Sequence, residues 1–208
     1  MKTKILGLLT VGLLGMPVLS GAAPAITFTG GTATTIFSNR TLGFNFFTRD
    51  DFVITSLGVW DRGGDGLAES HEVGIWSADG STLLISAIVP GGTTASLDSG
   101  FRFVAISPVV LPGASEFLAG SSTGTGVDAV IRFSAATTVS GISLGSTRFD
   151  PPFCGAFCAP LRTQGTTFDD GYFGPNFIGY AAVPEPGTLA LLGLGLAGLG
   201  LSRRRRAT

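Results

Sequence analysis

Residues 72–89 read EVGIWSADGSTLLISAIV, and this stretch decides the fold class. Residues 72–76 and 82–89 are apolar and rich in β-branched or aromatic side chains, so each is expected to form a strand. Asp79 and Gly80 lie in the short loop between them, and both residue types tolerate a positive φ. The stretch therefore predicts an antiparallel β-hairpin.

The segments on either side of this hairpin have the same character. Gly, Ser, Thr, Val, Ile and Phe dominate residues 26–182, and no long stretch there has the periodicity of an amphipathic helix. Further strands are expected at residues 42–47, 52–60, 101–106, 127–133, 138–144 and 172–180, with a turn at 108–113. We predict an all-β domain, a two-sheet antiparallel sandwich of jelly-roll or immunoglobulin-like type, with a closed barrel as the alternative.

Residues 1–25 have the layout of a secretory signal peptide, with two lysines, an apolar run at 5–19 that would be helical, and then small residues. Cleavage is expected after Ala25 or after Ala22. The secretion translocon and signal peptidase would then be partners of the chain. An uncleaved anchor is the alternative, which the small residues disfavour.

The charge of the chain is distributed unevenly. Six of the 13 basic residues lie in the two ends, as does one of the 14 acidic residues, so residues 26–182 carry seven arginines, no lysine and a net charge near −6. Such a body has no basic patch to neutralise phosphates, which argues against nucleic-acid binding. It suits a soluble extracellular protein.

The last 26 residues, 183–208, form a second candidate targeting segment, after the signal peptide. Pro184, Glu185 and Pro186 are followed by an uncharged run at 187–201 and by Arg203, Arg204, Arg205 and Arg206. As a helix rising about 1.5 Å per residue, residues 184–202 span roughly 27 Å, close to a thin bilayer, and the arginines fit the positive-inside rule. An ordinary C-terminal membrane anchor would have the same hydropathy.

The order VPEPGT (183–188), glycine-rich apolar span and arginine cluster resembles the PEP-CTERM sorting signal of exported bacterial proteins. The resemblance implies that an exosortase, a membrane-embedded processing enzyme, recognises Pro184, Glu185 and Pro186. It also implies that the chain crosses the inner membrane, which holds the tail transiently. The tail would be removed near the motif, leaving the body secreted or on the cell surface.

A second resemblance covers the hairpin itself. Residues 64–84, GDGLAESHEVGIWSADGSTLL, resemble β-sandwich modules of unknown function in PEP-CTERM proteins, where a GDGL…H.VGIW…G..L pattern precedes a hairpin. The similarity extends over about residues 42–119, and the family brings no assigned active site. Related modules are often rich in aromatic residues after the turn near Gly113, whereas this chain has SEFLAGSS at 115–122.

Cys154 and Cys158 are the only cysteines. In an exported protein they are expected to form a disulfide that closes a small loop. A zinc site is not expected, because the single histidine, His71, lies far away in the sequence.

The loop WDRGGDGLAE at 60–69 carries closely spaced carboxylates and glycines. Asp61, Asp65 and Glu69 are therefore candidate Ca²⁺ ligands, although their spacing matches no EF-hand. A polar loop whose aspartates bond their own backbone explains the pattern equally well. Apart from this calcium hypothesis, no cofactor or metal is expected.

Trp60 and Trp76 are candidate glycan-binding residues, since exposed indole rings can form a platform for sugars; burial in the core is the default. His71 could serve as an acid or base, but no nucleophile motif accompanies it, so a structural role is favoured. We therefore expect a non-catalytic exported surface or matrix protein. The alternatives are a carbohydrate-binding module for exopolysaccharide, assisted by Ca²⁺, and a small hydrolase.

Overall fold

The computed structural model describes residues 21–35, 37–132, 135–152, 154–155, 157–164, 171–182 and 195, and these residues confirm the all-β prediction. The strands in chain order are β1 (Ala23–Pro24), β2 (Ile26–Thr29), β3 (Thr32–Thr34), β4 (Thr41–Thr48), β5 (Phe52–Trp60), β6 (His71–Ser77), β7 (Leu83–Val89), β8 (Ser96–Asp98), β9 (Phe101–Leu111), β10 (Ser115–Ser122), β11 (Val130–Arg132), β12 (Ala135–Thr138), β13 (Ile142–Phe149), β14 (Arg162–Thr163) and β15 (Pro175–Ala181).

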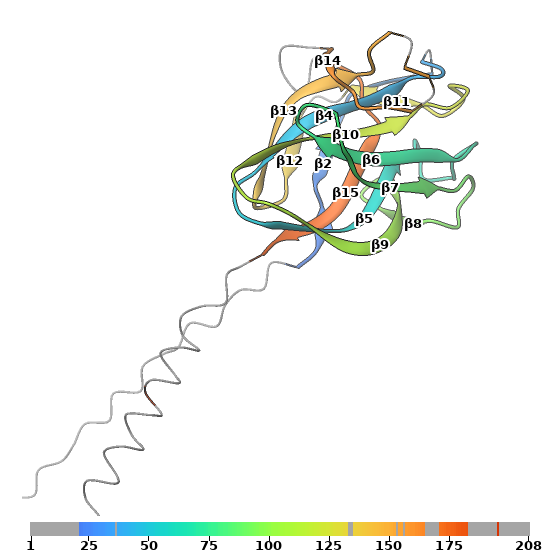
Figure 1. Cartoon of the computed structure of the whole chain (residues 1–208). Helices are drawn as coiled ribbons and strands as arrows, with labels where there is room; N and C mark the ends of the chain where they lie inside the picture. Colours follow the sequence, from blue (N-terminus) through green and yellow to red (C-terminus); the bar gives the residue numbers. More distant parts are fainter. Residues whose placement is uncertain are drawn as a thin grey trace, which may run out of the picture. The chain divides into compact units, whose positions relative to one another are not determined.

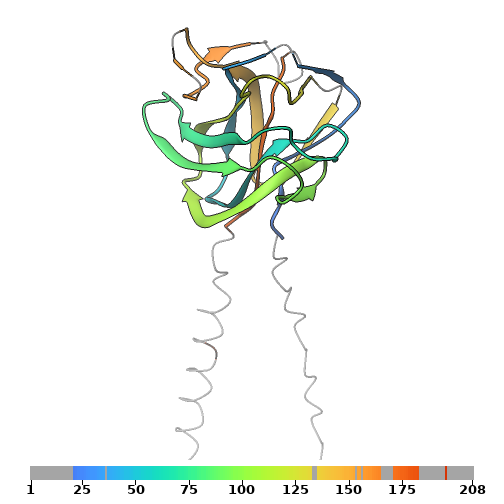
Figure 2. The same ribbon diagram turned by 90° about the vertical axis from the view of Figure 1, so that its right-hand side faces the viewer.

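Two larger sheets form the layers of the domain (Figure 1, Figure 2). One has the strand order β1-β15-β5-β9-β8, and the other has the order β14-β13-β4-β10-β6-β7. Two short pairs, β11 with β3 and β12 with β2, complete the described sheet structure. All pairings within these sheets are antiparallel.

Phenylalanine rings fill the space between the two sheets. Phe46 of β4 meets Phe177 of β15 with ring centroids 4.8 Å apart, and Phe44 lies edge-on to Phe173 at 6.0 Å. All four rings are fully buried, each contributing about 1.5–3 kcal/mol by leaving water. Because rings from both sheets interlock, the two layers form a β-sandwich.

The predicted hairpin is present as β6 and β7, and the boundaries of β5 coincide with the predicted strand at 52–60. Gly80 adopts φ 70° in the turn, as the positive-φ requirement anticipates. The Asp79 carboxylate accepts hydrogen bonds from the Ser77 hydroxyl and from the backbone and hydroxyl of Ser81. These bonds, above all the one from Ser77, lower the pKa of Asp79 below its ordinary value.

Some predicted boundaries are wrong. β9 continues through Pro108 to Leu111, where a turn was expected, because the register of β5 and β9 shifts here and a bulge accommodates proline. Residues 138–144 are not one strand, since a turn at residues 140–141 separates β12 from β13. β10 was not predicted at all. Where a strand was predicted at residues 127–133, the described residues form β11 only over Val130–Arg132. β15 begins at Pro175, three residues later than expected.

The two candidate targeting segments lie largely outside the described residues. Of the predicted signal peptide, residues 1–20 are not described. Of the predicted tail, only residue 195 is described, so Pro184, Glu185, Pro186 and the arginine cluster at 203–206 lie outside the described residues. Within the described part of the chain, no helix has the length and apolar character needed to span a membrane.

Candidate functional site

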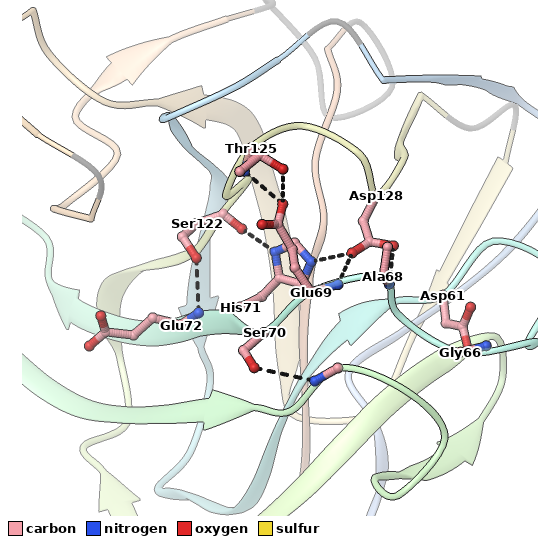
Figure 3. Close-up of polar contacts among 11 residues, drawn as sticks. Asp61, Gly66, Ala68, Glu69, Ser70, His71, Glu72, Ser122, Thr125 and Asp128 are labelled. Atoms are coloured by element: carbon pink, nitrogen blue, oxygen red, sulfur yellow. Dashed lines mark hydrogen bonds and ion pairs between the residues drawn. The ribbon is translucent and has the colours of Figure 1, made fainter.

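A buried histidine lies within a cluster of polar contacts (Figure 3). His71 is the first residue of β6, and its side chain is only 2% exposed. Its Nδ1 lies 2.8 Å from the carbonyl oxygen of Ser122, at the end of the neighbouring strand β10. A carbonyl oxygen only accepts hydrogen bonds, so Nδ1 donates and the orientation of the ring is fixed.

Asp128 faces the other ring nitrogen. Its Oδ2 lies 2.8 Å from His71 Nε2 and accepts a hydrogen bond from the backbone N–H of Glu69 at 3.0 Å. Its Oδ1 accepts a bond from the Ala68 N–H at 2.9 Å. The loop between β10 and β11 is therefore tied to the segment that leads into β6, and both histidine nitrogens face acceptors.

Glu69 provides a second carboxylate beside the imidazole. Its Oε1 accepts bonds from the backbone N–H and the hydroxyl of Thr125, at 2.6 and 3.0 Å. One ligand atom each of Glu69, His71 and Asp128 lie within 4.8 Å of one another. We call these three residues the EHD cluster.

The cluster does not resemble a serine-hydrolase site. Ser122 is the nearest bonded serine, and it meets His71 through its carbonyl, while its hydroxyl accepts a bond from the Glu72 N–H. Among the described residues, no serine hydroxyl is bonded to the imidazole. In the described part of the chain, the imidazole is therefore bonded to a carbonyl and a carboxylate rather than to a hydroxyl nucleophile.

The three predicted calcium ligands are not brought together. Asp61 is buried and pairs with Arg102, whose Nε lies 2.7 Å from Asp61 Oδ2. Asp65 is exposed on the same loop, and Glu69 belongs to the EHD cluster. The glycine-aspartate loop is thus organised by a buried ion pair rather than by a set of converging oxygens.

Arg102 completes the loop structure. Its guanidinium donates to the carbonyl oxygens of Gly64, Thr93 and Ala95 at 2.7, 3.3 and 3.1 Å. Asp61 Oδ2 also accepts a bond from the Gly66 N–H at 3.1 Å. Two loops are therefore fastened to β9 by one buried cation, a structural role that the sequence pattern did not reveal.

Both tryptophans are buried, as the default interpretation of the sequence has it, so neither lies exposed as a sugar platform would require. Trp60 is 8% exposed and belongs to the core between the sheets, whereas Trp76 is 4% exposed. Because side chains alternate along a strand, Trp76 and Leu118 point to the opposite face of the six-stranded sheet from the core. There they pack with Ala159 and Phe157, so the ring is covered.

The predicted disulfide is confirmed, and its loop contains one of the residues that cover Trp76. Cys154 and Cys158 are bonded, with Cα atoms 6.2 Å apart. Phe157, inside this small loop, lies with its ring centroid 5.0 Å from that of Trp76. The disulfide therefore constrains a loop that shields an aromatic ring on the outer face of the sheet.

Asp128 and Thr125 are the residues that sequence reasoning missed. They lie 57 and 54 positions after His71, in the stretch TGTGVDA at 123–129. Its alternating threonine and glycine indicate a tight loop, but no spacing rule connects that loop with β6. Only the pairing of β6 with β10 brings the two segments together.

The comparisons with known proteins identify the C-terminal targeting segment. The model of the PEP-CTERM protein-sorting motif matches residues 182–206. The chain thus carries a PEP-CTERM sorting motif, which indicates export to the cell surface or beyond through an exosortase-type enzyme. Comparisons with curated proteins and with solved structures gave no match.

Proposed function

We propose that this protein is a non-catalytic component of the cell surface or extracellular matrix, delivered by exosortase-dependent processing. The observation that carries the proposal is the sorting motif at residues 182–206. In this proposal the enzyme recognises Pro184, Glu185 and Pro186 and removes the tail near them. The body is then released or transferred to the surface.

The composition and bonding of the body support this role. Residues 26–182 are acidic and contain no lysine, which favours solubility outside the cell. The disulfide between Cys154 and Cys158 suits an oxidising compartment. The buried Asp61–Arg102 pair and the bonded His71 have evident structural roles, so neither requires a catalytic explanation.

The N-terminal strand favours signal cleavage after Ala22 rather than after Ala25. Ala23 and Pro24 form β1, which pairs with Gly179 and Ile178 of β15. Ala25 is fully buried, and its N–H donates to the carbonyl of Phe177 at 2.7 Å. Cleavage after Ala25 would remove this strand.

Cleavage after Ala25 would also create a charge in the interior. The new terminal ammonium would lie on Ile26, whose side chain is fully buried and whose N–H donates to Asn176 Oδ1 at 3.2 Å. Burying an ammonium without a counter-charge is costly. We therefore infer a mature chain that begins at Ala23.

Carbohydrate binding is the second candidate from the sequence, with exopolysaccharide as the ligand. Its structural basis was an exposed pair of indole rings, and Trp60 and Trp76 are both buried. No other described feature favours it over the surface-protein proposal. A small hydrolase is likewise unsupported by the partners of His71.

Intact-mass analysis of the protein recovered from the surface and medium of cells with an active exosortase tests the proposal. The expected product begins at Ala23 and lacks residues 187–208. Glu185→Ala is expected to leave the tail in place, whereas Arg205→Lys, which keeps the positive charge, should be processed normally. Recovery of a surface product that still contains Arg206 would overturn the proposal.

A further inference from the structure

We propose that the EHD cluster (Glu69, His71 and Asp128) binds a divalent transition-metal cation, for which Zn²⁺ is the appropriate probe. This proposal is independent of the sorting function. It rests on the geometry of three side chains and on the acceptors that surround a buried imidazole. His71 begins β6, Glu69 lies just before it, and Asp128 belongs to the loop between β10 and β11, so none of them is part of the C-terminal tail.

The first argument is the proton count at His71. Its Nδ1 donates to the Ser122 carbonyl, so the lone pair of a neutral ring lies on Nε2. That lone pair faces Asp128 Oδ2 at 2.8 Å, which is also an acceptor. Two acceptor atoms at this distance need a bridging atom, which can be a proton or a metal ion.

The second argument is that the surroundings match those of a metal-binding histidine. Such a histidine characteristically donates its other N–H to a backbone carbonyl or a carboxylate, which fixes the ring and raises the basicity of the ligating nitrogen. The Ser122 carbonyl has this position. The ring is 2% exposed, so it is held in one orientation before any ion arrives.

The third argument concerns the two carboxylates. Glu69 Oε1 is anchored by Thr125, while Oε2 accepts no hydrogen bond from the described residues. Asp128 Oδ1 is anchored by the Ala68 N–H, while Oδ2 accepts a bond from the Glu69 N–H and faces the imidazole. Glu69 Oε2 is thus available to an ion, whereas Asp128 Oδ2 would bind one while keeping its bond from the Glu69 N–H.

The distance between His71 Nε2 and Asp128 Oδ2 requires only a small adjustment. Zinc–nitrogen and zinc–oxygen bonds of about 2.0–2.2 Å place two ligands of a tetrahedral ion about 3.3 Å apart. The Nε2–Oδ2 distance of 2.8 Å would therefore open by about 0.5 Å on binding. The Asp128 side chain is 15% exposed, so the cluster has some access to solvent.

The donor set also indicates the class of ion. One imidazole nitrogen with two carboxylate oxygens suits Zn²⁺ and neighbouring transition metals, and three protein ligands leave a fourth position for water. Ca²⁺ prefers six to eight oxygen ligands and gains little from an imidazole. The cluster therefore should discriminate against Ca²⁺.

The test uses the full chain, purified in detergent with a tag that contains no histidine and stripped of metal with a chelator. Zn²⁺ titrated by calorimetry is expected to bind at one site, with no comparable heat from Ca²⁺. Glu69→Gln and Asp128→Asn, which preserve side-chain shape, should each weaken binding at least tenfold. Glu72→Gln is the matched control, because Figure 3 shows its carboxylate directed away from His71.

Because the chain has a single histidine, its ring nitrogens can be followed without ambiguity by ¹⁵N NMR. Zn²⁺ is expected to shift the Nε2 resonance while Nδ1 keeps its proton. If Nε2 carries a proton at saturating Zn²⁺, a proton rather than a metal ion bridges the two acceptors and the proposal fails. Equal Zn²⁺ affinity in wild-type, Glu69→Gln and Asp128→Asn proteins would also refute it.

Discussion

The buried Asp61–Arg102 pair predicts a large loss of stability when its acidic partner is removed. The two side chains are only 2% and 7% exposed, and Asp61→Ala leaves the guanidinium buried without a counter-charge. Breaking such a pair typically costs about 3–5 kcal/mol. Arg102 keeps three carbonyl acceptors, so we expect the lower end, about 3 kcal/mol of unfolding free energy.

Urea unfolding followed by tryptophan fluorescence is a direct assay, since both indole rings are buried in the folded protein. For a domain of this size, about 3 kcal/mol corresponds to a fall in Tm of about 6–12 °C. Asp65→Ala is the control, because Asp65 is an exposed acid on the same loop and should change stability by less than about 0.5 kcal/mol. Equal stability of the two variants would show that the buried pair contributes nothing and refute the reasoning.

Three further predictions concern the strands and the hairpin turn. Phe46→Ala should lower the unfolding free energy by about 3–5 kcal/mol, because it leaves a cavity in the core. Phe47 is 40% exposed, so Phe47→Ala should lower it by about 0.5 kcal/mol or less. Comparable losses of the two variants in urea unfolding would contradict the assigned faces of β4. Gly43→Ala should lower Tm, because its methyl group would collide with the backbone of β10, and an unchanged Tm would exclude that close approach. Asp79 has a lowered pKa in the folded state, so its stabilising contribution is present above its ordinary value of 3.8 and is lost as pH falls through the folded pKa; Ser77→Ala should raise that pKa in a ¹³C NMR titration.

The strands that could be predicted from the sequence are those in which the buried residues are apolar or β-branched. The run at 52–60 is almost wholly apolar or β-branched, and β5 has these bounds. In contrast, β10 lies between β4 and β6, yet it ends in Gly120, Ser121 and Ser122. Gly120 permits close packing against Thr41 and Pro160, and both serines are buried. Small polar residues at a buried strand end look like a loop in the sequence.

The candidate site was only partly predictable for a related reason. Glu69 was expected to be a cation ligand, but with Asp61 and Asp65 as its partners. Sequence proximity suggested that grouping, whereas the fold turns Asp61 toward Arg102 and pairs Glu69 with residues more than 50 positions away. Long-range pairing of β6 with β10 decides which side chains meet, and no local pattern contains that information.

The order β1-β15-β5 has a consequence for the timing of folding during export. A chain that crosses a membrane from its N-terminal end delivers β15 last among the strands. Until then β1 lacks the partner to which it is bonded, and β5 is paired only with β9. Contacts between strands so far apart in sequence form slowly, because closing a long loop costs conformational entropy before the contacts stabilise it. The sandwich therefore closes only when residues 175–181, directly before the sorting tail, have crossed.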